Sequence, residues 1–112
     1  MKRIEAIIRP TKVGKVCTAL EEVGNYRPII SQIEERGGLE VIRYLSRGKT
    51  YKADLMTKTR VEIVVKDKEK DKIVKAIRTA AFTGNIGDGM IFVHAMDGAI
   101  QISTGESGEA VL

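Results

Sequence analysis

The order in which the hydrophobic pattern of this chain changes its period restricts the fold more than any single motif. Residues 2–9 alternate between apolar and polar side chains, which predicts a strand with one covered face. Residues 28–35, 61–65 and 91–96 have the spacing and composition of further strands. Residues 13–23 and 73–81 instead repeat apolar side chains every three or four residues, as amphipathic helices do. The pattern therefore predicts the order β-α-β-β-α-β.

The ends of the two helices are also marked in the sequence. Thr11 and Asp67 are expected to cap the helix starts, and Gly24 is expected to end the first helix. The only cysteine, Cys17, falls on the apolar stripe of the first helix, which predicts a buried and unreactive thiol. A short strand over residues 99–103 is expected to follow the last of the main strands.

This order of elements is that of the ferredoxin-like fold, an α+β sandwich. Right-handed crossovers would place both helices on one face of a four-stranded antiparallel sheet, and residues 1–112 are expected to form one domain. The other face would carry the side chains of Ile7, Val64, Phe92 and Met96. Water would contact this face in a single copy, so we expect self-association to cover it.

Composition argues against several classes of protein. No apolar run approaches the roughly 20 residues of a membrane span, and no signal peptide is recognisable, so we expect a cytoplasmic location. The only histidine, His94, has no companions at metal-ligand spacing, and no nucleophile–base pair is visible. We therefore expect no metal site, no catalytic residues and no enzymatic activity, and we expect His94 to make a structural hydrogen bond.

The net charge of +4 is concentrated in one segment. Residues 36–60 contain seven basic residues and two acidic ones, and residues 36–57 show no sustained hydrophobic period. A long irregular segment in a small domain is usually functional or disordered, and its basic character fits an anionic partner or ligand. A solvated loop whose charge maintains solubility would have the same composition, so both interpretations stay open.

Three glycines, Gly84, Gly87 and Gly89, lie between the second helix and the last main strand. Glycine lets the backbone approach a ligand closely, and successive N–H groups in such a loop can form a nest for an anion. A helix C-cap followed by an ordinary turn has the same composition. Spacing alone favours the turn over the anion nest.

Nearly the whole chain resembles the PII family, trimeric signalling proteins of nitrogen metabolism. Order, spacing and length all match at residues 2–10, 47–51, 61–65, 83–92 and 103–109, with Lys58 between them. The resemblance implies a homotrimer whose inter-subunit clefts bind AMP, ADP or ATP as an effector. It also implies a projecting T-loop over residues 37–55, a B-loop over 83–90 and a C-loop over 101–109.

The resemblance assigns functions to individual residues of this chain. Arg47 and Tyr51 of the T-loop would dock on a protein target, a membrane transporter among them, and Tyr51 occupies a position that is modified in some members. The B-loop would hold the phosphates, the backbone at residues 63–64 would contact the adenine, and a neighbour's C-loop would close the cleft. From the sequence, Lys58 could equally well be an ordinary surface lysine, and Glu62 an ordinary outward-facing strand residue. The nucleotide-binding residues implied are Gly37, Gly38, Lys58, Glu62, Ile63, Val64, Gly87, Asp88, Gly89, Met90, Gln101 and Ser103.

Several of these positions depart from the family pattern. Where the family usually has a lysine and two arginines on the phosphates, this chain has Met90, Gln101 and Ser103. Charge-assisted hydrogen bonds contribute roughly 1.5–3 kcal/mol each, so a polyphosphate would be held less tightly. Leu39 replaces the glutamine that reaches Mg²⁺ when ATP and 2-oxoglutarate bind together, and a leucine offers no oxygen to a hard cation. The chain thus resembles a divergent member.

The leading hypothesis is a nucleotide-responsive trimer that regulates a partner protein of nitrogen metabolism through its T-loop. A structural adaptor that has lost its ligand is one alternative, and a regulator of carbon or metal transport is another. An RNA-binding module shares the order of elements and the basic loop, but the third strand, residues 59–66, has none of the aromatic side chains on which bases stack. Nucleic acid is therefore not expected as a partner.

Overall fold

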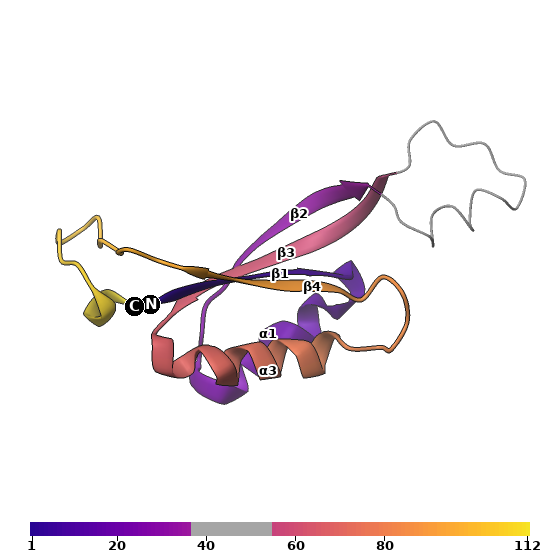
Figure 1. Cartoon of the computed structure of the whole chain (residues 1–112), viewed down its shortest axis with the longest axis horizontal. Helices are drawn as coiled ribbons and strands as arrows, with labels where there is room; N and C mark the ends of the chain where they lie inside the picture. The colour runs from indigo at the N-terminus through magenta and orange to yellow at the C-terminus, as the bar shows by residue number, and fades with distance from the viewer. Residues whose placement is uncertain (37–54) are drawn as a thin grey trace, which may run out of the picture.

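The computed structural model describes residues 1–36 and 55–112 of the chain, which form one antiparallel sheet with two helices on one face (Figure 1). The main elements are β1 (Lys2–Ile8), α1 (Val13–Gly24), β2 (Ile29–Arg36), β3 (Leu55–Val65), α3 (Lys70–Ala81) and β4 (Gly89–Ala95). The strands lie in the order β2-β3-β1-β4, so β2 and β4 are the edges. This arrangement confirms the predicted ferredoxin-like fold.

The strand bounds differ from the predicted ones where the hydrophobic period is weak. β3 begins at Leu55, six residues before the predicted start at Val61, because its first residues pair with β2 and present polar side chains as well as apolar ones. β4 begins at Gly89 and thus includes the end of the predicted B-loop. The expected strand over residues 99–103 is not formed, and a single bridge joins Ile100 to Ser107 instead.

The core lies between the sheet and the helices, where the predicted apolar stripes meet. Cys17 is only partly buried, so the prediction of a buried thiol was wrong. Val16 and Leu20 take the positions that face the sheet, and the next residue along a helix is turned about 100° away from them. The buried core residues are Ile4, Ala6, Ile8, Val16, Leu20, Val61, Ile63, Val65, Ile73, Ile77 and Ala81.

Neither predicted N-cap is used. A single 3₁₀ turn precedes each helix, at Pro10–Lys12 and Asp67–Glu69, so Thr11 and Asp67 lie inside a turn rather than at a cap. The Asp67 carboxylate instead lies 2.8 Å from the amino group of Met1, and this hydrogen bond lowers the pKa of Asp67. α1 ends at Gly24 as predicted, but the residue with left-handed backbone is Asn25, at φ 58°.

The sheet face opposite the helices is less apolar than expected. Besides Ile7 and Phe92 it carries ion pairs across the strands, between Arg3 and Glu62 at 3.3 Å and between Arg60 and Glu5 at 3.9 Å. His94 lies opposite Arg3, and its Nε2 atom is buried without a hydrogen-bond partner among the described residues, contrary to the bond expected there. A partner surface on this face would therefore have to match charged as well as apolar groups.

Candidate functional site

The segment between α3 and β4, residues 82–88, is called the glycine loop here. Gly84 and Gly87 have φ values of 86° and 102°, in the region that side chains with a Cβ rarely adopt. Gly89 follows at the start of β4 with φ 101°, and a Cβ atom there would lie 1.7 Å from the backbone oxygen of Ile7. The close approach of the loop end to β1 therefore requires glycine at position 89.

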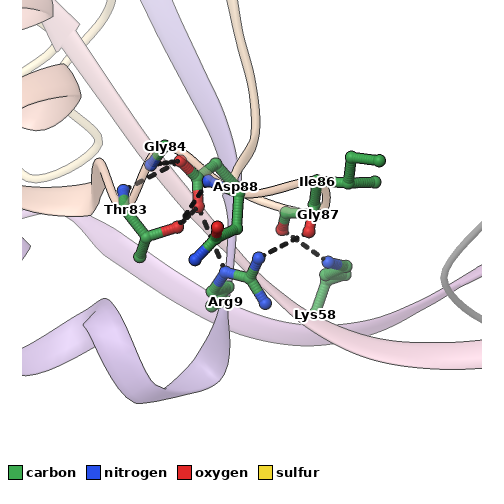
Figure 2. A network of polar contacts seen from close by, with 8 residues as sticks. Arg9, Lys58, Thr83, Gly84, Ile86, Gly87 and Asp88 are labelled. Carbon is green, nitrogen blue, oxygen red and sulfur yellow. Dashed lines mark hydrogen bonds and ion pairs between the residues drawn. The ribbon is translucent and has the colours of Figure 1, made fainter.

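The carboxylate of Asp88 holds the glycine loop together from inside (Figure 2). One of its oxygens accepts the backbone N–H groups of Thr83 and Gly84, at 2.8 and 2.9 Å. The other accepts the hydroxyl of Thr83 and the Nε–H of Arg9, the latter at 3.2 Å. These bonds, that of the Thr83 hydroxyl foremost, hold the pKa of Asp88 well below its usual range. The side chain of Asp88 thus serves as an internal acceptor, a role that its assignment to the nucleotide site did not anticipate.

Two cationic side chains attach the loop to the sheet through its carbonyl oxygens. Arg9, just after β1, donates from Nη2 to the oxygen of Ile86 at 2.6 Å. Lys58, on β3, donates from Nζ to the oxygen of Gly87 at 2.9 Å (Figure 2). Lys58 is only 2% exposed, so the interpretation of it as an ordinary surface lysine was wrong. Sequence reasoning missed Arg9, whose contact with Asp88 joins residues 79 positions apart.

A cavity of about 320 Å³ opens beside the loop on the uncovered face of the sheet. The structure brings four of the predicted nucleotide-binding residues together at this cavity, which we call the glycine-loop cavity. Sequence reasoning did not identify Glu35, which also lines it. The lining residues are Ile7, Glu35, Lys58, Ile86, Gly87, Gly89, Met90 and Phe92.

A second hollow of about 570 Å³ lies toward the other end of β3 and is called the β3 hollow. Glu62, Ile63 and Val64 line it together with Tyr26 and Leu112. Burial and a hydrogen bond to the Glu69 carboxylate raise the pKa of the Tyr26 phenol to about 12. The predicted adenine contacts and the predicted phosphate contacts therefore line two different hollows of one chain.

The remaining predicted contacts belong to the segment after β4, residues 97–108, which we call the C-terminal arm. The arm leaves the end of β4 that is farthest from the glycine loop (Figure 1). Gln101 and Ser103 are exposed there, and backbone bonds such as Gln101 N–H to the Glu106 oxygen, at 2.8 Å, fold the arm. These two residues do not meet Met90 within the chain. Gly37, Gly38, Leu39, Arg47 and Tyr51 lie outside the described residues.

Neither a metal site nor a membrane-spanning helix is found among the described residues. Residues 1–36 and 55–112 bring together no group of three His, Cys, Asp or Glu side chains that could hold a metal ion. In the part of the chain that the structure describes, no helix is long and apolar enough to cross a membrane. The four-stranded sheet, the two helices and the glycine loop define the chain, at this level, as a small ferredoxin-like domain.

Comparison with known proteins narrows this class to one family. The family model for nitrogen regulatory protein P-II matches residues 1–106. Nitrogen regulatory protein P-II 2 of Methanothermobacter thermautotrophicus is 44% identical over 97% of this chain and 95% of its own length. Nitrogen regulatory protein P-II of Rhizobium meliloti is 43% identical over 96% of both chains. The crystal structure of Arabidopsis thaliana PII bound to citrate aligns with a TM-score of 0.77 at 31% identity, over 97% of this chain and 89% of that one.

The chain therefore belongs to the nitrogen regulatory protein P-II family. It is a signal-transduction regulator of nitrogen metabolism and not an enzyme. Proteins of this family are typically trimeric, bind protein targets and use adenine nucleotides as effectors. The predicted family and function are thus confirmed at this level.

Proposed function

We propose that this chain forms a homotrimer that binds an adenine nucleotide in clefts between neighbouring subunits. One observation carries the proposal: the predicted contacts among the described residues lie in three places, at the glycine loop and its cavity, at the β3 hollow and on the C-terminal arm. No single chain can close them around one ligand, whereas neighbouring copies arranged in a ring can bring one subunit's loop to another's hollow and arm. Ile63 and Val64 would contact the adenine, and Gly87, Asp88 and Gly89 the first phosphates.

The outer phosphates would be held weakly in this cleft. Met90, Gln101 and Ser103 carry no cationic groups, and Lys58, the remaining cation, gives one of its three N–H donors to the Gly87 oxygen. Backbone N–H groups of the glycine loop need no particular side chain to contact a phosphate. We therefore infer a divergent member of the family in which AMP or ADP competes effectively with ATP, and in which Mg²⁺ with 2-oxoglutarate adds little.

The regulated partner would dock on the T-loop, residues 37–55, with Arg47 and Tyr51 as contacts. A cytoplasmic protein of nitrogen metabolism or the cytoplasmic side of a membrane transporter would suit its basic composition. Loss of the three cationic donors also favours a second candidate, a trimeric adaptor that binds its partner without any nucleotide. A regulator of carbon or metal transport would be the same nucleotide-binding trimer with another target protein.

Calorimetric titration of the protein with AMP, ADP and ATP tests the proposal. We expect ATP to bind no more than about tenfold more tightly than ADP, because the missing donors would each contribute roughly 1.5–3 kcal/mol. A triple variant, Met90→Lys with Gln101→Arg and Ser103→Arg, should strengthen ATP binding selectively.

Two results would contradict parts of this proposal. Wild-type protein that binds ATP far more tightly than ADP, and more tightly again with 2-oxoglutarate, would disprove the inferred divergence. No heat with any nucleotide would favour the adaptor. Sedimentation of a 12.3 kDa monomer at micromolar concentration would disprove the trimer.

A further inference from the structure

Glu35 introduces a negative charge into the glycine-loop cavity. On the edge strand β2, Ile33 pairs with Lys58 of β3, and cross-strand partners project from the same face of a sheet. Glu35 lies two residues further along β2, so its side chain is on this face as well. Glu35 thus lines the cavity that Gly87 and Gly89 also line.

The charges around this cavity nearly cancel among the residues that the structure describes. Lys58 and Glu35 are the charged residues of its described lining, and the Lys58 amine is engaged with the Gly87 oxygen. The neighbouring side chains of Met90 and Phe92 are apolar and 61% and 42% exposed. Such a wall can accept one phosphate at the N–H groups of the glycine loop, but it does not balance the charges of a chain of phosphates.

We propose that Glu35 is a specificity-determining residue that makes this cavity select an adenine nucleotide with one phosphate over the diphosphate and triphosphate. Each additional phosphate brings further negative charge toward the carboxylate, and the repulsion grows in a cavity partly shielded from water. The first phosphate can still use the N–H groups of the glycine loop. This inference rests on the proposed function, namely that the phosphate end of an adenine nucleotide enters this cavity.

Two matched variants test the role of Glu35. Glu35→Gln removes its charge with little change of shape, and Glu34→Gln makes the same change one residue earlier, on the opposite face of the same strand. Both side chains are exposed, so both variants should fold. AMP, ADP and ATP are titrated into each protein by calorimetry at low salt and again at about 0.5 M salt.

We expect Glu35→Gln to strengthen ATP binding about tenfold and ADP binding less, with AMP changed by less than about twofold. Glu34→Gln should change all three by less than about twofold. In the wild type, the preference for AMP should shrink at high salt, because salt screens the repulsion between partly exposed charges.

The outcomes separate this inference from the proposed function. Equal effects of the two variants, or no gain in ATP affinity with Glu35→Gln while AMP still binds, would overturn the role of Glu35 alone. Wild-type protein that prefers ATP over AMP would overturn it as well. If no nucleotide binds to any of the three proteins, the proposed nucleotide site itself is wrong, and the inference fails with it.

Discussion

The glycine loop and the C-terminal arm lie at opposite ends of β4 and are stabilised in different ways. Side chains from three parts of the chain, Arg9, Lys58 and Asp88, hold the glycine loop in one shape. Backbone bonds and the hydroxyl of Thr104 fold the arm, and its Ile102 is fully exposed. The first region is held by contacts within one chain, whereas the second exposes an apolar side chain at Ile102 that no described residue covers.

This difference determines what a substitution in each region should affect. Changes in the glycine loop remove bonds that the isolated chain makes, so they should alter folding and local order. Changes at exposed positions of the arm remove no contact within the chain, so they should alter assembly instead. Three substitutions test this contrast, in order of decreasing effect.

The largest effect is expected for Gly89→Ala. The added Cβ would lie 1.7 Å from the Ile7 oxygen, in a backbone conformation that alanine disfavours. We expect the free energy of unfolding to fall by about 2–5 kcal/mol, as measured by urea denaturation. Gly98→Ala is the control, since nothing lies within 4 Å of its Cβ position. Equal stability of the two variants would show that the loop is not fixed against β1.

An intermediate effect is expected for Asp88→Asn. The two carboxylate oxygens accept four bonds, and an amide can replace only one of these oxygens, so its NH₂ group would face a donor. We expect amide hydrogen exchange at Thr83 and Gly84 to speed up at least about tenfold, because the loop would open more often. The exposed Asp97→Asn variant provides the same change of charge outside the loop.

Acid should reproduce this effect in the wild-type protein. The pKa of Asp88 is lowered by folding, so the stability that its bonds contribute is fully present above the ordinary carboxyl pKa of about 3.9 and is lost as the pH falls from there through the lowered pKa of the folded protein. The amide resonances of Thr83 and Gly84 should therefore stay constant from neutral pH to about pH 4 and shift only below it. Shifts centred above pH 5 would contradict the anchoring role of Asp88.

The smallest effect on the stability of the chain is expected for Ile102→Ser. Its side chain is fully exposed, so unfolding of the dissociated chain should change by less than about 0.5 kcal/mol. Sedimentation at falling protein concentration should nevertheless show weaker assembly, if a neighbouring subunit covers the arm. A destabilised monomer would mean that the arm packs on its own chain, and unchanged assembly would mean that Ile102 contacts no neighbour.

The sequence predicted those features that depend on local periodicity. The stripes that contain Leu20 and Ile77 and the alternation of β1 were sufficient for the order of elements and most of the core. The resemblance then added the glycine loop and Lys58 as candidates for the site. Contacts between distant residues left no periodic signal, so neither Arg9 on Asp88 nor Glu35 at the cavity was foreseen.

The wrong predictions, for the two helix caps and for Cys17, also depend on geometry that local residue spacing does not show. Thr11 and Asp67 have good capping side chains, but the 3₁₀ turns before the helices move the N-caps to Lys12 and Glu69 and the helix starts to Val13 and Lys70. Cys17 lies next to the core-facing Val16 on the stripe, and spacing does not show where the covered sector of a helix ends. Arg9 was visible in the sequence as a basic residue directly after the first strand, but strand periodicity does not show what such a residue contacts.

The buried amine of Lys58 provides a position at which chemical modification can report on opening of the glycine loop. Acylating reagents attack the uncharged amine of exposed lysines, and an amine that is 2% exposed and donates to the Gly87 oxygen is shielded from them. Modification at Lys58 thus requires the contacts that cover its amine, the one with the Gly87 oxygen among them, to open first. The mass added at this one lysine, relative to exposed lysines such as Lys15, therefore counts how often the loop opens.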